Sequence, residues 1–334
     1  MTEISTRQTT RESRQRTPAA SQLAADPVFW AAWLYYERGL KQDEVAAVLG
    51  CSRASVFNLL QRARDERIVT VALDSTRLQQ CELAFDLASA GGLAECHLLP
   101  AIDSGADLYD SLGLFGARLL EPRITDDEVL GVSWGRTVLA LSQALSTIAR
   151  PGVTVAQLNG SAMATYDFSP EFCTSNIARR LNARCVNLLA PGLVSSRDVK
   201  SLLMKEPIIR EHFRLLRQCT KSLFGVTHLG GDTLLDGSGF MTEAQLEGYK
   251  RRGAVGFASG YFFDIDGTII RQDFDERHIV MPLKDFLKVD ERICIGGGPT
   301  KTEAIVGMLR AGLVSVLITD DATAAAVLAL LASA

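Results

Sequence analysis

The sequence predicts an N-terminal helix-turn-helix domain (residues 23–75) followed by a doubly wound, mostly parallel α/β domain (residues 76–334), with residues 1–22 as a disordered tail. Three observations lead to this prediction. A chain of 334 residues is too long for one small module. Residues 26–65 carry three helical periodicities separated by glycines. From about residue 76, short apolar runs alternate with helical patterns, which is typical of strands covered on both faces.

Two short helices are expected first. Asp26 followed by Pro27 marks a helix start, because aspartate accepts hydrogen bonds from the free amides of a first turn and proline fits its first position. This helix is expected to end at Gly39. A second helix is expected over residues 42–49, and Gly50 after it allows the tight turn that a helix-turn-helix needs.

A third helix is expected to begin after Ser52 and to read DNA. Its apolar residues repeat at helical spacing and would face inward: Val56, Leu59, Leu60 and Ala63. In a helix-turn-helix, the second helix of the pair lies in the major groove with its first residues at base edges. The expected contacts are Arg53, Ser55 and Asn58 at bases, Gln42 and Ser52 at phosphates, and Arg62, Arg64 and Arg67 along the backbone.

A three-helix bundle without a DNA partner is the alternative for this segment. The chain has 35 Lys and Arg against 39 Asp and Glu, so it has no overall positive field for nucleic acid or an anionic membrane. Residues 21–75 are not basic either. Their charges are nevertheless separated, since Asp43 and Glu44 lie on the second helix whereas the third is basic as far as Arg64. This separation favours local DNA binding.

A short strand at residues 68–73 and a helical connection over 74–92 are expected to lead into the α/β domain. Eight further strands are expected, at residues 95–99, 129–133, 153–158, 185–189, 223–227, 255–263, 292–295 and 314–319. The apolar run at 322–334 is too short for a membrane span and is expected to form a last core helix. Such alternation suits one doubly wound domain.

Three glycine-rich loops follow strands of this expected sheet. The carboxyl ends of parallel strands meet at one edge, where backbone amides and helix starts face anions. The loops hold Ser133, Trp134, Gly135, Arg136 and Thr137 in the first, Asn159 and Gly160 in the second, and Gly296, Gly297, Gly298 and Lys301 in the third. Together they predict one ligand site, with the first loop as a phosphate cradle. Neither a Walker pattern nor a dinucleotide fingerprint is present.

Residues 262–269 resemble the first motif of haloacid-dehalogenase-type phosphatases, in which Asp264 would be the nucleophile. Only 66 residues (334 − 268) follow Thr268, which leaves little room for the rest of such a catalytic domain. We favour instead a hairpin turn at Asp266-Gly267 leading into a strand over 268–271. A phosphatase using Asp264, or a sugar-phosphate isomerase, remains the enzyme alternative.

The histidines and cysteines predict no metal site, cofactor or catalytic triad. The four histidines have no acid or nucleophile at a telling spacing, and the seven cysteines form no C-x-x-C pair. Residues 1–20 contain no apolar stretch of a secretory signal. We therefore expect a cytoplasmic protein with reduced thiols and no membrane partner.

The order of these motifs resembles the SorC-type (SorC/DeoR, sugar-binding) bacterial transcriptional regulators. The resemblance covers nearly the whole chain, at residues 31–69, 131–137, 158–160, 260–267, 296–301 and 317–324. It implies an effector domain similar to glucosamine-6-phosphate deaminase and ribose-phosphate isomerase folds that acts as a sensor and not as an enzyme. It also implies operator DNA, a sugar or polyol that is commonly phosphorylated, and a homodimer or homotetramer.

The resemblance also implies roles for single residues. Ser133, Gly135, Arg136 and Thr137 would bind phosphate, Asn159 and Gly160 would line the pocket, Gly297 and Lys301 would close its far side, and Trp134, Gly260 and Asp264 would complete the effector contacts. Two positions depart from the family pattern. Phe57-Asn58 stands where many members have Ser-Arg, and Ser133 stands where glycine is frequent, so operator preference and the amide geometry of the first loop do not transfer.

Overall fold

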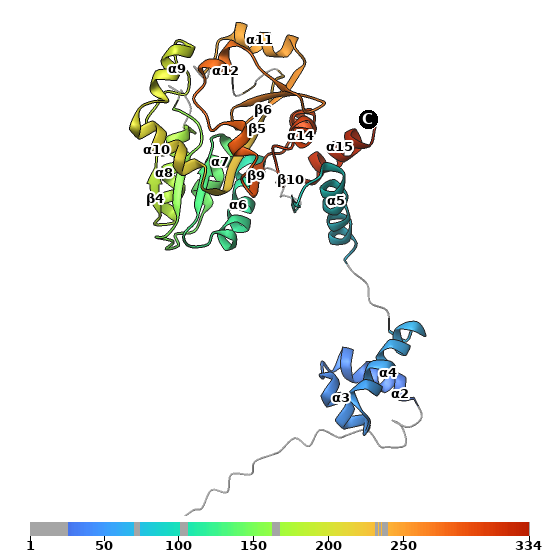
Figure 1. The fold of residues 1–334 in the computed structure, drawn as a ribbon. Coiled ribbons are helices and arrows are strands. Elements are labelled where there is room, and N and C mark those ends of the chain that lie inside the picture. The colour runs from blue at the N-terminus through green and yellow to red at the C-terminus, as the bar shows by residue number, and fades with distance from the viewer. Residues whose placement is uncertain are drawn as a thin grey trace, which may run out of the picture. The chain divides into compact units, whose positions relative to one another are not determined.

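The computed structural model describes residues 26–69, 74–100, 106–161, 168–230, 233, 235 and 240–333 (Figure 1). The chain divides into two compact units, Met1–Asp74 and Ser75–Ala334.

The first unit is a small helical bundle. Its helices are α2 (Pro27–Ala32), continued by the π-helical turn η1 (Trp33–Glu37), then α3 (Gln42–Leu49) and α4 (Arg53–Asp65). The predicted caps are confirmed: Asp26 accepts a hydrogen bond from the Phe29 amide at 2.9 Å, and Ser52 from the Ser55 amide at 3.1 Å. The core contains the predicted inward residues Val56 and Leu60, together with Val45 of α3. Within the expected strand at 68–73, residues 68 and 69 form a bend instead, and 70–73 lie outside the described residues.

The second unit is built on a mixed sheet in which ten strands are described. Seven run parallel in the order β1 (Glu95–Leu99), β10 (Val316–Asp320), β9 (Glu291–Ile295), β5 (Cys219–His228), β2 (Val129–Val132), β3 (Thr154–Gln157) and β4 (Arg184–Val186). The predicted mostly parallel sheet is confirmed. The expected strand at 185–189 is shorter than predicted, since it ends at Val186.

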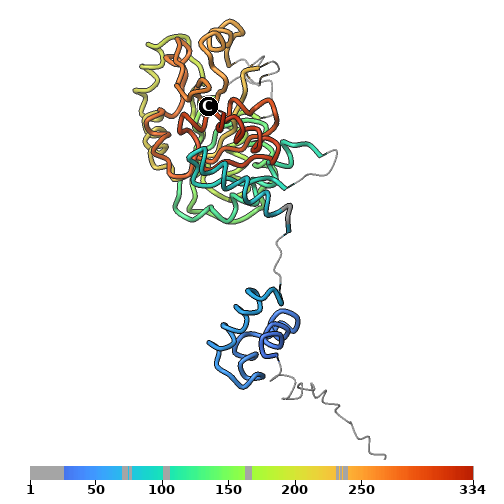
Figure 2. Tube along the Cα trace, turned by 90° about the vertical axis from the view of Figure 1, so that its right-hand side faces the viewer, coloured from blue at the N-terminus to red at the C-terminus, as the bar shows by residue number. Residues whose placement is uncertain are grey.

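Helices cover both faces of this sheet, as the trace in Figure 2 also shows. One face packs against α6 (Leu108–Leu120), α7 (Arg136–Ala144) and α8 (Pro170–Arg180). The other packs against α5 (Ser75–Gly91), α10 (Pro207–Leu216), α13 (Leu283–Phe286), α14 (Thr302–Arg310) and α15 (Asp321–Ala332). The remaining helical segments are η2 (Glu121–Arg123), α9 (Arg197–Leu203), α11 (Glu243–Arg251), α12 (Asp273–Arg277) and η3 (Pro299–Lys301).

The single strand predicted at 255–263 is wrong, because two antiparallel strands lie there. β6 (Ala254–Ala258) turns at Ser259 and Gly260 into β7 (Tyr261–Asp264). Gly260 has φ +94°, and a Cβ atom there would lie 2.6 Å from a methyl carbon of Val280. Glycine is therefore required both by the backbone conformation and by the lack of room for a side chain. β7 then pairs with β8 (Ile269–Ile270), which confirms the predicted hairpin at Asp266-Gly267.

Candidate functional site

A narrow cavity lies at the carboxyl edge of the parallel sheet. The end of β5 lies between β9 and β2, so the loops that follow those two strands flank it. The cavity is lined by Tyr109, Trp134, Gly135, Arg136, Thr137, Gly225, Val226, Thr227, His228 and Lys301. The structure therefore brings together four residues of the first predicted loop and the lysine of the third.

Two cations of the cavity share one aromatic ring. The Arg136 guanidinium carbon lies 5.8 Å from the ring centre of Tyr109, and the Lys301 Nζ lies 4.8 Å from it. Tyr109 comes from α6, whereas the cations come from loops after β2 and β9. Among the described residues that line the cavity there is no carboxylate, so its field is positive.

Lys301 is the more deeply buried of the two cations. Its side chain is 6% exposed, and it forms no hydrogen bond or ion pair with the described residues. The pKa of its ammonium group is lowered to about 8, chiefly by burial; the positive charge of Arg136 acts in the same direction and the carboxylate of Asp320 in the opposite one. Such a buried cation without an ion-pair partner is costly unless an anion binds beside it.

The third loop is held by the carboxylate of Asp320, the residue that ends β10. The Gly298 amide donates to Asp320 Oδ2 at 3.0 Å and to Thr323 Oγ1 at 2.7 Å. Gly297 packs so closely that a Cβ atom there would lie 2.2 Å from Asp320 Oδ2. Gly297 therefore brings the loop against Asp320. This contact positions η3, whose last residue is Lys301, directly before α14.

The first loop presents the start of α7 to the cavity. Arg136 is the first residue of this helix, and the amides of a first turn have no partner within the helix. The Thr137 hydroxyl donates to the carbonyl oxygen of Ile295 at 2.8 Å, so it has no proton left to donate to a ligand. What Thr137 can offer an anion is its backbone amide, together with the positive end of the helix dipole.

The second loop forms a buried polar cluster rather than part of the cavity lining. The Ser133 hydroxyl donates to Asn159 Oδ1 at 2.8 Å, and the Ser133 amide donates to the Leu223 carbonyl at 2.9 Å. The Gly160 amide donates to the Ile279 carbonyl. Asn159 Nδ2 is buried without a partner among the described residues. Ser133 thus orients Asn159 and leaves the Asn159 amide group able to donate.

Asn159 is one of several buried polar groups that lack partners in the described chain. The others nearby are the Ser259 hydroxyl and both ring nitrogens of His278. A Cβ atom on Gly260 would lie 2.9 Å from the His278 ring and 3.2 Å from Asn159 Nδ2, which places these groups around the β6–β7 turn. Burial lowers the pKa of His278 to about 3, so its ring is neutral. No sequence signal had marked His278.

Asp264 lies outside the cavity lining. Its Oδ1 accepts hydrogen bonds from the Asp266 amide at 3.1 Å and the Thr268 amide at 2.7 Å, which stabilise the hairpin turn. The motif that resembles a phosphatase is therefore a turn between β7 and β8 in this fold.

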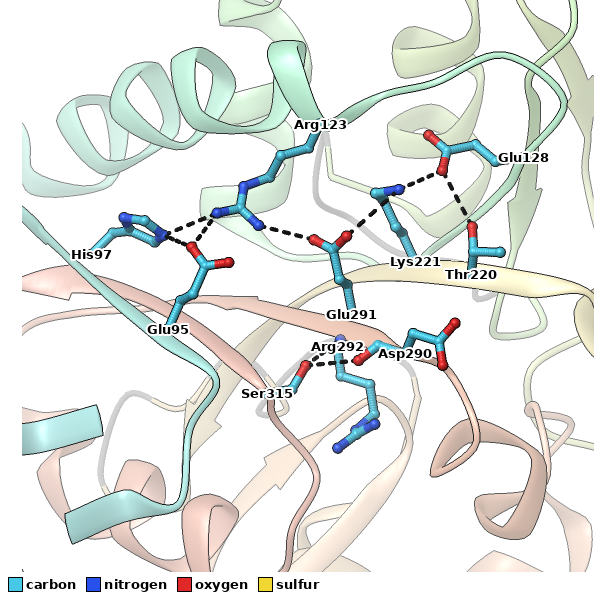
Figure 3. Close-up of polar contacts among 10 residues, drawn as sticks. All are labelled: Glu95, His97, Arg123, Glu128, Thr220, Lys221, Asp290, Glu291, Arg292 and Ser315. Carbon is cyan, nitrogen blue, oxygen red and sulfur yellow. Dashed lines mark hydrogen bonds and ion pairs between the residues drawn. The ribbon is translucent and has the colours of Figure 1, made fainter. Parts of the chain in front are cut away.

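The opposite, amino-terminal edge of the sheet carries charges that neutralise one another (Figure 3). Arg123 pairs with Glu95 and with Glu291, and Lys221 pairs with Glu128 at 2.5 Å and with Glu291 at 3.6 Å. The carboxyl edge differs because its two cations, Arg136 and Lys301, form no ion pair with any residue that the structure describes. A larger hollow at α9 and α12 is also less suited to an anion, since its cations are accompanied by Asp275 and Glu276.

The predicted DNA-reading residues lie on the exposed face of the first unit. Arg53, Ser55 and Asn58 are all exposed on α4. Arg53 pairs with Asp43 at 3.7 Å, but both side chains are about 70% exposed, so this pair is weak. Arg62 pairs along the same helix with Glu66 at 2.8 Å.

Sequence reasoning missed five lining residues of the cavity. Tyr109, Gly225, Val226 and Thr227 carried no motif, and His228 was one of the four histidines without an acid or nucleophile at a telling spacing. Within the described part of the chain, no helix is long and apolar enough to cross a membrane, and no group of three metal-binding side chains is found.

Comparison with known proteins gives consistent results. The family described as "Putative sugar-binding domain" matches residues 76–329. The uncharacterized transcriptional regulator YjhU of Escherichia coli K12 is 33% identical over 310 residues, covering 91% of this chain and 94% of that protein. The deoxyribonucleoside regulator of Bacillus subtilis strain 168 is 29% identical over 302 residues, covering 89% and 95%. The fold is similar to the full-length sorbitol operon regulator SorC of Klebsiella pneumoniae, with a TM-score of 0.71, 23% identity, and coverage of 90% and 98%.

Proposed function

The chain belongs to the SorC-type family of sugar-binding transcriptional regulators, and from this premise we propose that a phosphorylated sugar or polyol binds the carboxyl-edge cavity and changes the affinity of α4 for operator DNA. One observation supports this proposal above the others. Arg136 and Lys301 face the same ring of Tyr109 without a carboxylate among the described lining residues. This arrangement suits a dianionic phosphate.

The rest of the ligand would meet polar groups on other elements. The amides at the start of α7 would bind phosphate oxygens, and the free amide group of Asn159 would take a hydroxyl. Two similar proteins are named for a sorbitol operon and for deoxyribonucleosides, which supports a carbohydrate or polyol operon as the target.

Control of DNA binding would follow from linkage. A ligand that binds one arrangement of the oligomer more tightly than another shifts the population toward it, and DNA affinity shifts by the same coupling free energy. A homodimer or homotetramer suits this role, because two heads on two half-sites gain affinity that a single head without net positive charge lacks. Such a regulator acts in the cytoplasm. We propose binding without turnover, since the Asp264 carboxylate is engaged in the hairpin turn.

Thermal unfolding with a panel of sugar phosphates, free sugars and polyols tests the ligand. A compound present at a hundred times its dissociation constant should stabilise the protein by about 2.7 kcal/mol. We expect a selective shift by a phosphorylated compound that is lost in Arg136→Ala. A shift by an unphosphorylated polyol alone, retained in Arg136→Ala, would contradict the proposed phosphate site.

Selection from a random duplex library tests the DNA-reading helix. The parent protein should enrich a sequence with two half-sites, and Arg53→Ala should enrich none while its ligand-induced stabilisation is unchanged. Enrichment of the same sequence by Arg53→Ala would contradict the assignment of α4.

A further inference from the structure

Helix α5 has apolar side chains on two opposite faces. Its inner face packs into the core of the domain through Leu83, Ala84 and the fully buried Leu87. This face lies beside α15, where Gln80 donates to Asp321 Oδ2 at 2.7 Å (Figure 1). The outer face carries Leu78 and Phe85, which are 39% and 74% exposed, with an exposed Cys81 between them. A face of this kind needs a partner to bury it.

The spacing of the outer face indicates which kind of partner fits. Leu78, Cys81, Phe85 and Ala88 follow one another at intervals of three, four and three residues, which is the a and d pattern of a heptad. We call these four residues the α5 seam. Because the inner face already holds α5 on the domain, the seam does not need the many heptads of an isolated coiled coil.

The charges beside the seam fit a second copy of the same helix. Arg77 precedes Leu78 at a g position, and Glu82 follows Cys81 at an e position. In a parallel pair, a g residue faces the e residue five positions later on the partner, so Arg77 of each copy would face Glu82 of the other. In an antiparallel pair that aligns the same four residues, Leu78 would face Ala88, and Arg77 would face the uncharged Ser89 of the partner and not Glu82. The charge pattern therefore selects the parallel arrangement.

We propose that the α5 seam is an interface between two copies of this chain, with the two α5 helices parallel. This inference rests on the proposed function in one respect: parallel helices bring the two Ser75 ends of α5 to the same end of the interface, which suits a protein that reads two half-sites. Each seam residue then faces its own counterpart, and Cys81 faces Cys81.

Cross-linking with a short bismaleimide tests this interface without DNA or effector, so its failure is distinguishable from failure of the proposed function. Cys185 is a matched control, because it is also exposed but lies on β4, at the far edge of the sheet. We expect a covalent dimer from the parent and from Cys185→Ser, and none from Cys81→Ser. A dimer formed equally by Cys81→Ser, or no dimer from the parent, would overturn the proposal.

A second measurement is the molar mass by light scattering over a dilution series. Phe85→Glu should weaken self-association by at least about thirtyfold, because it removes an aromatic anchor at the centre of the interface and places two carboxylates there. Phe85→Leu should associate like the parent. Phe172→Glu alters a phenylalanine that is 48% exposed on α8 and should also associate like the parent.

Folding of Phe85→Glu is not in question for a side chain that is 74% exposed, and thermal unfolding checks it. Parental molar mass and parental cross-linking in Phe85→Glu would overturn the proposal. Equal weakening in Phe172→Glu would show a general effect of added charge and would also overturn the assignment of the seam.

Discussion

Replacing Lys301 with methionine should make the ligand-free protein more stable while removing its response to effector. The ordinary lysine pKa of 10.5 falls to about 8 in the folded protein because the ammonium group is buried. This difference corresponds to roughly 3 kcal/mol in favour of the unfolded chain when the lysine is charged in both states. Methionine keeps an unbranched chain in the same space, so Lys301→Met should gain about 1 to 3 kcal/mol at neutral pH.

The pH dependence separates this cause from a packing effect. The cost of the charged lysine is fully present below pH 8, the folded pKa, and declines toward pH 10.5, the pKa of the unfolded chain. The gain in Lys301→Met should therefore fall to roughly half at about pH 9.5. Urea unfolding followed by circular dichroism at both pH values measures it.

Lys221→Met is the matched control, because Lys221 is equally buried but paired with Glu128 at 2.5 Å. Removing one partner of a buried ion pair leaves an uncompensated charge, so this variant should lose about 3 to 5 kcal/mol. If Lys301→Met were less stable than the parent at neutral pH, or if its gain did not change with pH, Lys301 would not be an uncompensated buried cation.

Four other changes have expected results. Effector affinity should fall by up to about tenfold for each pH unit above 8, because Lys301 loses its proton there. Calorimetric titration measures this fall, and the affinity of Lys301→Arg should depend less on pH. In fluorescence anisotropy, Arg53→Ala should abolish operator binding, whereas Arg62→Ala should weaken it only modestly because Arg62 already pairs with Glu66; the reverse order would refute the base-reading role of Arg53. Thr137→Val removes the hydrogen bond to the Ile295 carbonyl, so it should cost about 1 kcal/mol in unfolding experiments and blunt the effector response, with DNA binding unchanged when no effector is present. Asp264→Asn should leave the effector response intact, and magnesium-dependent phosphate release by the parent that disappears in this variant would support an enzyme instead.

The periodic parts of the fold could be predicted from the sequence. The helix after Ser52 was predicted because its apolar residues repeat at helical spacing and a hydroxyl residue precedes it, and both signals are local. The parallel strands were predicted because each is an apolar run bounded by turn residues. The turn between β6 and β7 was missed, since serine and glycine inside an apolar run also fit a continuous strand.

The candidate site depends on contacts that no local pattern carries. The loops of Arg136 and Lys301 were predicted because glycines follow their strands, but Tyr109, which contacts both cations, lies on a helix without a motif. The Thr137 hydroxyl was expected to bind phosphate, whereas it donates to a carbonyl of a neighbouring strand. Such partners are set by the order of strands in the sheet, which single residues do not reveal.

Calorimetric titration of one phosphorylated sugar or polyol and of its dephosphorylated counterpart, into the parent and into Arg136→Ala, tests the central claim most directly. Binding of the phosphorylated compound alone, weakened in the variant by at least about tenfold, is the expected result for a charge-assisted contact to phosphate. Equal affinity of the parent for both compounds, unchanged in Arg136→Ala, would contradict the assignment of the carboxyl-edge cavity as the anion site.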